Sequence, residues 1–155
     1  MKKEHVLARL KEDCLVAVVR AKNYEQGEKV VDAIIEGGIN FIELTMTMDD
    51  GDPVGFIKKM ADKYKDNDKI VIGAGTVLDP ETARACILAG ANYIVSPGLN
   101  VETIKLCNRY RGPLKELIAA GPTIFPGKIL ITSHPASIAV IASLGVITPG
   151  SIGTL

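Results

Sequence analysis

Short apolar runs alternate with longer amphipathic stretches over the first 111 residues of the chain. The runs are rich in branched apolar residues and too short for helices, which is typical of strands buried on both faces. The longer stretches carry apolar residues three and four positions apart, the spacing of one helix face. The pattern predicts four strand–helix units, with strands over 14–19, 40–45, 69–74 and 91–95 and helices over 23–36, 53–64, 79–88 and 100–110.

Capping residues mark several of these helix ends. Asp79 followed by Pro80 is a favourable helix start, because the carboxylate accepts hydrogen bonds from backbone N–H groups and proline suits the first turn. Asn100 is expected to begin the last helix in the same way. Gly37 and Gly38 are expected to end the first of the four helices.

Buried strands that alternate with helices predict a parallel sheet, for which a TIM barrel and a doubly wound open sheet are the two candidate architectures. The polar residues that end the strands favour the barrel, because a barrel gathers the carboxyl ends of all its strands around one site. An open sheet concentrates them at one switch point. We therefore expect an α/β TIM (β/α)8 barrel. The strand-end groups are Arg20, Glu43, Thr45, Thr47, Thr76, Ser96 and Pro97.

Charge and composition exclude several classes of protein. The chain has 155 residues, 18 basic and 18 acidic, and this balance argues against binding to nucleic acid or to a membrane surface. No apolar run approaches the roughly 18 residues of a membrane span, and the first residues lack the apolar core of a signal peptide. Three scattered cysteines fit a reducing compartment, so a cytoplasmic location is expected.

The charge is distributed unevenly along the chain. Residues 1–111 hold 33 of the 36 charged residues, and residues 112–155 hold only three. We expect one barrel domain over residues 1–155, in which 1–111 form regular units and 112–155 form an anomalous tail. Eight units need about 200 residues or more, so the barrel is incomplete in this sequence. A divergent end, a rearranged or truncated sequence and an unreliably read sequence all remain open.

Glu43 and Arg20 are the main candidates for chemistry. Glu43 lies near the end of an apolar strand, where a carboxylate is costly unless it is paired, hydrogen-bonded or functional. Arg20 follows another buried strand, and its guanidinium can hold a carboxylate or phosphate through two parallel hydrogen bonds. The alternatives are a solvent-facing Glu43 and an ion pair between the two residues.

Two loops and the cysteines carry weaker signals. The segment from Gly73 to Thr76 would let the backbone approach a ligand, although it lacks the third glycine of a dinucleotide fingerprint. The loop at Ser96 and Pro97 is either part of a site or an ordinary turn. The cysteines are expected to be packing residues, and no spacing of His, Cys or Asp resembles a metal site.

Several sequence words occur together, in order and at compatible spacing. They are Val18-Val19-Arg20, Gly37-Gly38-Ile39, Ile42-Glu43-Leu44-Thr45, Val71-Ile72-Gly73-Ala74-Gly75-Thr76-Val77-Leu78, Ala89-Gly90-Ala91 and Ile94-Val95-Ser96-Pro97-Gly98-Leu99. Over about residues 6–111 the chain resembles the 2-keto-3-deoxy-6-phosphogluconate / 4-hydroxy-2-oxoglutarate aldolases.

The resemblance implies a cytoplasmic class I lyase of the Entner–Doudoroff type, built as a homotrimeric TIM barrel and requiring no metal or other cofactor. A lysine would form a Schiff base with pyruvate or with a 2-keto acid, phosphorylated in some cases, and Glu43 would be the general acid/base. Thr76 and Pro97 resemble residues that line the pyruvyl pocket, and Arg20 resembles an arginine that faces the anionic groups of the substrate. Thr47 stands where some members carry an anion-binding arginine.

The resemblance is lost after residue 112. Thr123 stands where the family has its Schiff-base lysine, and the family's phosphate loop has no counterpart. Lys128, which precedes the apolar run 129–131, is then the candidate lysine, with an ordinary surface lysine as the alternative. Two other functions remain open: a TIM-barrel epimerase or isomerase of sugar phosphates, and a keto-acid-binding barrel without catalytic activity.

Overall fold

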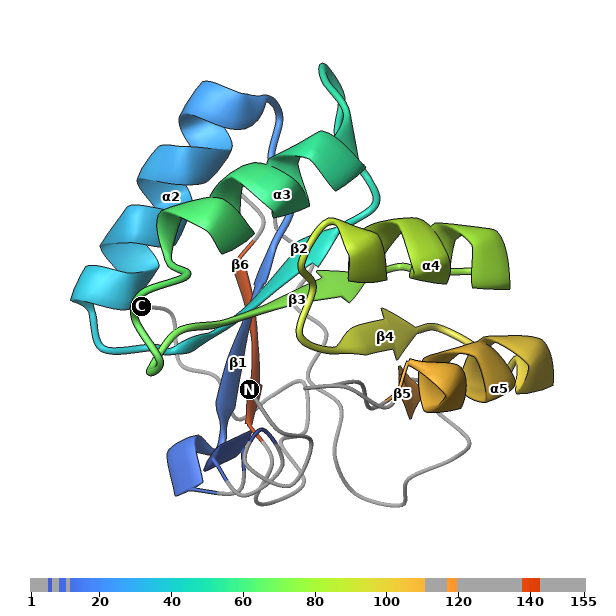
Figure 1. Cartoon of the computed structure of the whole chain (residues 1–155). Helices are drawn as coiled ribbons and strands as arrows, with labels where there is room; N and C mark the ends of the chain where they lie inside the picture. Colours follow the sequence, from blue (N-terminus) through green and yellow to red (C-terminus); the bar gives the residue numbers. More distant parts are fainter. Residues whose placement is uncertain (1–5, 7–8, 11, 111–116, 120–137, 143–155) are drawn as a thin grey trace, which may run out of the picture.

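The computed structural model describes residues 6, 9–10, 12–110, 117–119 and 138–142. All four predicted strand–helix units are confirmed (Figure 1), with element ends that differ from the expected ones by a few residues at most. Two further strands lie in the charge-poor tail. The elements are β1 (Leu15–Val19), α2 (Tyr24–Glu36), β2 (Phe41–Thr45), α3 (Pro53–Lys63), β3 (Val71–Gly75), α4 (Pro80–Leu88), β4 (Ile94–Ser96), α5 (Val101–Arg109), β5 (Leu117–Ala119) and β6 (Ile138–Ala142).

The four helices begin at capping side chains. Asp79 accepts a hydrogen bond from the Thr82 backbone N–H, and Asn100 accepts from the backbone N–H groups of Glu102 and Thr103. Both predicted caps are therefore confirmed. Asn23 and Asp52 cap α2 and α3 in the same way. These side chains satisfy backbone donors that have no partner inside the helix.

The strands form one sheet in the order β5-β4-β3-β2-β1-β6. Five strands are parallel, as predicted, but β6 pairs with β1 in the antiparallel direction. The prediction of a parallel sheet is therefore wrong for β6. Strand direction follows from tertiary pairing, which the apolar pattern of 138–142 does not encode. Within the described residues, β5 and β6 form the two edges of the sheet.

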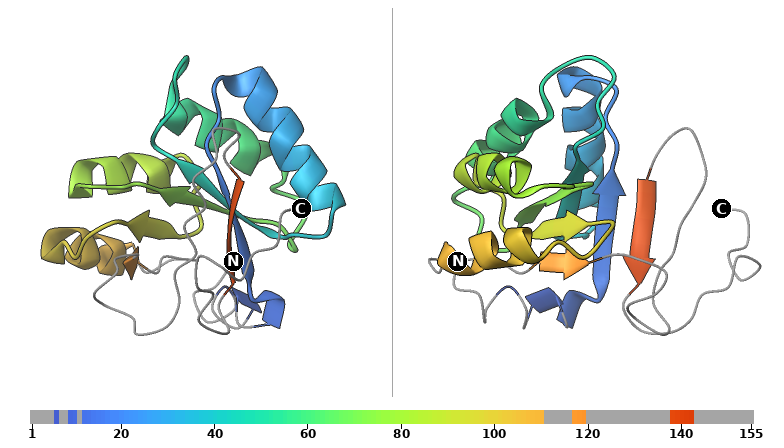
Figure 2. Two further views of the ribbon diagram at one scale, coloured as in Figure 1. Left: turned by 180° about the vertical axis from the view of Figure 1, so that it is seen from behind. Right: turned by 90° about the vertical axis from the view of Figure 1, so that its right-hand side faces the viewer.

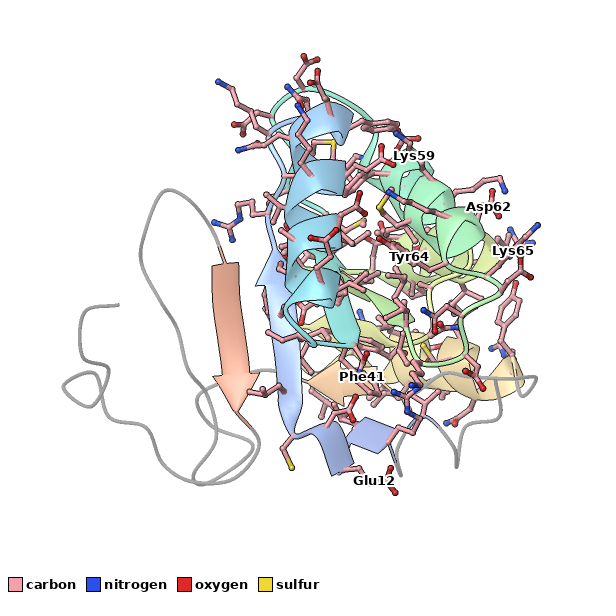
Figure 3. All side chains as sticks on the ribbon, turned by 90° about the vertical axis from the view of Figure 1, so that its left-hand side faces the viewer. Glu12, Phe41, Lys59, Asp62, Tyr64 and Lys65 are labelled. Atoms are coloured by element: carbon pink, nitrogen blue, oxygen red, sulfur yellow. The ribbon has the colours of Figure 1, made fainter. Side chains whose placement is uncertain are left out.

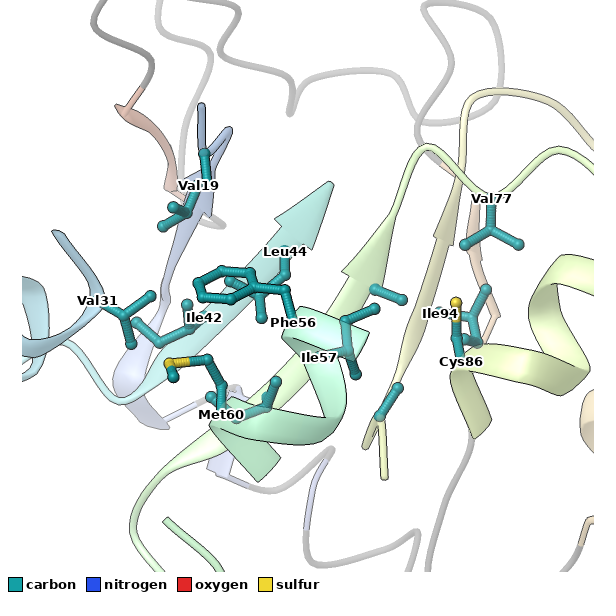
Figure 4. Close-up of a cluster of buried hydrophobic side chains, with 14 of the residues drawn as sticks. Val19, Val31, Ile42, Leu44, Phe56, Ile57, Met60, Val77, Cys86 and Ile94 are labelled. Carbon is teal, nitrogen blue, oxygen red and sulfur yellow. The ribbon is translucent and has the colours of Figure 1, made fainter. Parts of the chain in front are cut away.

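Helices α2 to α5 cover one face of the sheet, which we call the outer face (Figures 1 and 2). Alternate strand residues such as Val19, Ile42 and Leu44 point toward these helices and pack against Phe56 and Met60 (Figure 4). Burial of such a side chain contributes about 1.5–3 kcal/mol relative to leaving it exposed. Cys86 and Cys107 lie in the same cluster, which confirms their predicted packing role.

The opposite face, which we call the inner face, carries the other alternate strand residues. Near the amino ends of the strands this face is apolar, and Val6 and Leu10 of the N-terminal segment pack against it. Successive side chains of a strand point to opposite faces, so Glu43 and Thr45 share the inner face with Phe41. The strand residues of this cluster are Val16, Phe41, Val71 and Val95, and Tyr93, which directly precedes β4, joins them.

The outer surfaces of α2 and α3 carry charged side chains. Lys59 contacts Glu28, and Lys63 contacts both Glu28 and Asp32 at 2.7–2.8 Å. Figure 3 shows Lys59 and Asp62 among the charged side chains of this surface. Exposed ion pairs of this kind typically contribute less than about 1 kcal/mol each. They connect two neighbouring helices and belong to the solvated surface of the domain. Among the helices described, none is both long and apolar enough to cross a membrane.

Candidate active site

Glu43 lies in the middle of β2 on the inner face, where only 5% of the residue is exposed. Burial raises the pKa of its carboxyl to about 7, because desolvation penalises the charged form. Its Oε2 atom is buried and has no hydrogen-bond partner among the described residues. An unsatisfied buried polar group costs about 1–3 kcal/mol, so this carboxyl is maintained at the expense of stability.

Neither alternative for Glu43 agrees with the structure. The side chain does not face solvent, and no ion pair joins it to Arg20, which is exposed after the end of β1. Desolvation is the cause of the raised pKa, with no contribution from a neighbouring cation. A buried acid whose pKa lies near 7 is a candidate general acid/base.

The glycines of β3 provide the space that Glu43 needs. A Cβ atom built on Gly75 would lie 1.9 Å from Glu43 Oε1, and one on Gly73 would lie 2.3 Å from the Tyr93 ring. The prediction that this segment lets the backbone approach a ligand stays a prediction. In the structure its glycines accommodate two side chains of the chain itself, so the segment also positions the acid.

Thr45 and Thr47 lie at and just beyond the carboxyl end of β2. Thr45 is buried, and its hydroxyl lies 2.9 Å from that of Thr47, which is exposed. The two side chains therefore form a pair with its outer member at the surface. A hydroxyl pair of this kind can bind an oxygen atom of a small ligand.

Thr76 follows β3 in a conformation with φ of +60°, which is uncommon for a residue other than glycine. The neighbouring backbone holds it there, because Met46 N donates to Gly75 O at 2.8 Å and Val77 N donates to Val95 O at 3.1 Å. Strained backbone that the surrounding structure imposes is characteristic of functional sites.

Pro97 is exposed in the loop after β4, where Ser96 Oγ donates to Gly98 O at 2.8 Å. This hydrogen bond is that of an ordinary turn. Parallel strands place their carboxyl ends along one edge of a sheet, so the topology brings the predicted strand-end residues to the same edge. These residues are Arg20, Thr45, Thr47, Thr76 and Pro97, above the buried Glu43.

The remaining candidates lie in the tail. Lys128 and Thr123 are outside the described residues, so the structure does not test the assignment of the lysine. Among the residues that are described, no group of three or more His, Cys, Asp or Glu side chains could hold a metal ion.

Tyr93 is the site residue that sequence reasoning missed. The residue is 1% exposed, and its hydroxyl is buried without a described partner. Burial raises the pKa of its hydroxyl, and the nearby Glu43 adds to this shift. A tyrosine within an apolar strand is typical of core packing. That Tyr93 lies beside Glu43 follows only from the register of β2, β3 and β4. The signal in the sequence is the pair Gly73 and Gly75, because two glycines on one face of a strand leave space for bulky neighbours.

The raised pKa of Glu43 predicts a pH-dependent stability. Between pH 4.5 and about 7 the unfolded chain ionises Glu43 while the folded chain keeps it protonated. The folded state then binds more protons, so Glu43 should make the free energy of unfolding fall with rising pH, by up to about 1.4 kcal/mol per pH unit. Urea denaturation of the protein and of Glu43→Gln across this range measures the contribution. Identical pH dependence in both proteins would contradict it.

The sequence matches one family over most of its described length. Residues 6–127 match the model of the family described as KDPG and KHG aldolase. The chain belongs to this aldolase family. The resemblance expected from the sequence words is thereby confirmed, and the match extends beyond the four regular units into the tail.

Individual relatives of the aldolase family agree with this assignment. The chain is 31% identical over 112 residues to a 2-dehydro-3-deoxy-phosphogluconate aldolase of Treponema pallidum, covering 71% of this chain and 50% of that protein. It is 30% identical over 100 residues to the KHG/KDPG aldolase of Escherichia coli K12, covering 64% and 45%. The chain thus spans about half the length of the curated relatives it matches.

A solved aldolase has the same fold over the described units. The KDPG aldolase of Legionella pneumophila, determined with pyruvate captured as a covalent carbinolamine intermediate, superposes with a TM-score of 0.53 at 26% identity. The match covers 64% of this chain and 45% of that one. The described sheet and helices are therefore part of a TIM barrel, as predicted, and the barrel is incomplete in this chain.

Proposed function

We propose that the protein is a class I aldolase that cleaves 2-keto-3-deoxy-6-phosphogluconate, 4-hydroxy-2-oxoglutarate or both to pyruvate and an aldehyde. The observation that carries the proposal is Glu43, a buried carboxyl in the middle of β2 whose pKa burial raises to about 7. A general acid/base works best when its pKa lies near the working pH. Family membership and the carbinolamine captured in the Legionella enzyme support Schiff-base chemistry.

In the proposed reaction a lysine amine condenses with the C2 carbonyl of the substrate, which releases water and leaves a protonated imine. Glu43 as carboxylate takes the proton of the C4 hydroxyl while the C3–C4 bond breaks. The aldehyde leaves, and the bonding electron pair moves into the imine to form an enamine. Glu43 then returns its proton to C3, and a water molecule hydrolyses the imine to free pyruvate and the lysine.

The strand-end residues are proposed to bind the substrate. Arg20 carries the positive charge expected opposite a carboxylate or phosphate, and its exposed position suits the distal end of a substrate. Thr45 and Thr47 offer a hydroxyl pair at the carboxyl end of β2, the strand that carries Glu43. Thr76 and Pro97 are proposed to line the pocket of the pyruvyl group.

Lys128 is our proposed Schiff-base lysine, and reductive trapping tests it. Incubation with pyruvate and sodium borohydride should leave a stable carboxyethyl group on Lys128, which peptide mass spectrometry locates. Lys128→Arg is the control, and it should not be labelled at this position. Labelling of another lysine would support the proposed aldolase function and would assign the Schiff base to that lysine instead of Lys128. Absence of label on every lysine would contradict the Schiff base.

The trapping experiment also distinguishes two alternative functions, a keto-acid-binding barrel and a sugar-phosphate epimerase or isomerase. The threonine at position 123, in place of the family's lysine, favours a barrel that binds a keto acid without turning it over. Calorimetry with pyruvate would then detect binding without an adduct. A sugar-phosphate epimerase or isomerase would show no pyruvate adduct and would exchange a substrate proton with solvent.

We also propose that the whole chain forms one barrel domain and that the protein is a cytoplasmic homotrimer. Large apolar side chains are exposed on the β3–α4 and β4–α5 connections and at the start of α5, and such exposure supports contact with another chain. They are Leu78, Leu99 and Val101, each more than half exposed.

A further inference from the structure

Two buried polar atoms on the inner face have no hydrogen-bond partner among the described residues. They are Glu43 Oε2 and the hydroxyl oxygen of Tyr93. Buried polar atoms in native proteins almost always have a partner, so each unpartnered atom calls for an explanation. The two groups are also complementary, because a phenol donates a hydrogen bond and a carboxylate accepts one.

The glycines of β3 place these two groups side by side. The ring carbon of Tyr93 that bears the hydroxyl is the atom nearest to a Cβ built on Gly73, at 2.3 Å. The carboxyl of Glu43 lies over Gly75, with Cδ 2.6 Å from a Cβ built there. A side chain at position 73 and one at position 75 would project from the same face of β3, about 6.6 Å apart along the strand. The phenol and the carboxyl therefore occupy adjacent positions.

Other groups around Glu43 do not supply this donor in the described part of the chain. On β1 its register partner is Val18, and Arg20 lies beyond the strand end with its side chain exposed. On β3 it faces glycines. At the amino ends of the strands, Arg9 and Asp13 pair with each other at 3.4 Å, and Arg9 lies over the ring of Phe41. In the segment directly before β4 the titratable group is Tyr93.

We propose that Tyr93 is the positioning residue of the acid/base: its hydroxyl donates a hydrogen bond to the Glu43 carboxylate, reached by a change in the side-chain torsions of Glu43. This role rests on the function proposed for Glu43. The hydrogen bond stabilises the ionised form, in which Glu43 accepts a proton from substrate. It opposes the effect of burial and fixes the orientation of the carboxylate.

Burial raises the pKa of Tyr93, and the Glu43 charge adds to this shift, which supports their proximity. The phenol therefore stays protonated throughout the working range of the acid/base. Only its donor function is used, so the tyrosine is not required to transfer a proton itself.

Tyr93→Phe tests the proposal, because it removes the hydroxyl and keeps the ring that fills the space over Gly73. The pKa of Glu43 is followed by ¹³C NMR of protein labelled at the glutamate carboxyls, with Glu43→Gln to assign the signal. We expect Tyr93→Phe to raise the pKa of Glu43 by about half a pH unit or more, since a donor to the charged form is lost. The matched control is Tyr24→Phe, which removes a hydroxyl bonded to the Asp52 carbonyl and should leave Glu43 unchanged.

An unchanged Glu43 pKa in Tyr93→Phe would overturn the proposal. So would a higher urea midpoint above pH 7, because removal of a hydroxyl without a partner stabilises the fold and removal of a donor to the carboxylate does not. Both readouts are independent of turnover. A wild-type protein that fails to cleave substrate contradicts the proposed function, whereas an active protein with an unshifted Glu43 contradicts only the role of Tyr93.

Discussion

Replacing Glu43 with glutamine is expected to lower kcat for cleavage of the keto acid by about 10²–10⁴-fold. Glutamine keeps the size of the side chain and can neither take the proton from the C4 hydroxyl nor return one to C3. The KM should change much less, because the substrate is bound by the strand-end residues and by the lysine. Coupling the released pyruvate to lactate dehydrogenase provides the rate.

Borohydride trapping with pyruvate distinguishes a lower kcat in Glu43→Gln from a loss of folding. Glu43→Gln should still form the borohydride-reducible adduct with pyruvate, because lysine attack precedes the proton transfer assigned to Glu43. Full activity in Glu43→Gln would remove the carboxyl from the mechanism. Loss of both the adduct and the urea transition would show that the residue maintains the fold instead.

Gly75→Ala is expected to lower kcat by about 10²-fold or more without removing any reactive group. The new methyl would lie 1.9 Å from Glu43 Oε1 and 2.8 Å from its Cγ, so the carboxyl must move. A displacement of about 1 Å at a catalytic group can cost 10²-fold in rate. The change acts on position alone, because Glu43 remains present. The same coupled assay measures it.

Gly98→Ala is the matched control, since a Cβ built on Gly98 meets nothing within 4 Å. It should retain wild-type activity. The double variant Gly75→Ala/Glu43→Gln should be no slower than Glu43→Gln alone, because both changes act through the same carboxyl. A Gly75→Ala protein with an unchanged kcat would show that the rate does not depend on the position of the Glu43 carboxyl over Gly75.

The local elements of the first 110 residues could be predicted because several independent signals coincide in them. Asp79 with Pro80, and Asn100, mark helix starts through side-chain chemistry that acts within one turn. The alternation in β2 also places Glu43 opposite the apolar set that faces the helices. These signals depend on neighbours in the chain, so a single sequence carries them.

The site could be predicted in part for a related reason. Parallel strands bring their carboxyl ends together whatever the exact register, so Arg20, Thr45 and Thr76 could be grouped from their order alone. The environment of Glu43 could not be predicted, because it depends on register. The pairing of Glu43 with Gly73, and of Ala74 with Ile94, determines that Tyr93 lies beside the acid.

Residues 112–155 are the part of the chain for which the sequence pattern predicted least. The run 138–142 is apolar and suits a strand, but nothing in its pattern indicates β1 as its partner or an antiparallel direction. The lysine assignment depends on the same region. Both questions concern contacts between distant parts of the chain, which periodicity does not describe.

The pairing of β6 with β1 also has a consequence for the order of folding. Strands β1 to β4 are neighbours both in the chain and in the sheet, so each pairing closes a loop of a single helical unit. The β1–β6 ladder joins Leu15 to Ala142 and must close nearly the whole chain. Loop-closure entropy grows with the length enclosed, and non-local pairings form slowly. The four units that carry Glu43 and Tyr93 are thus the natural nucleus, and β6 docks last on an edge already assembled.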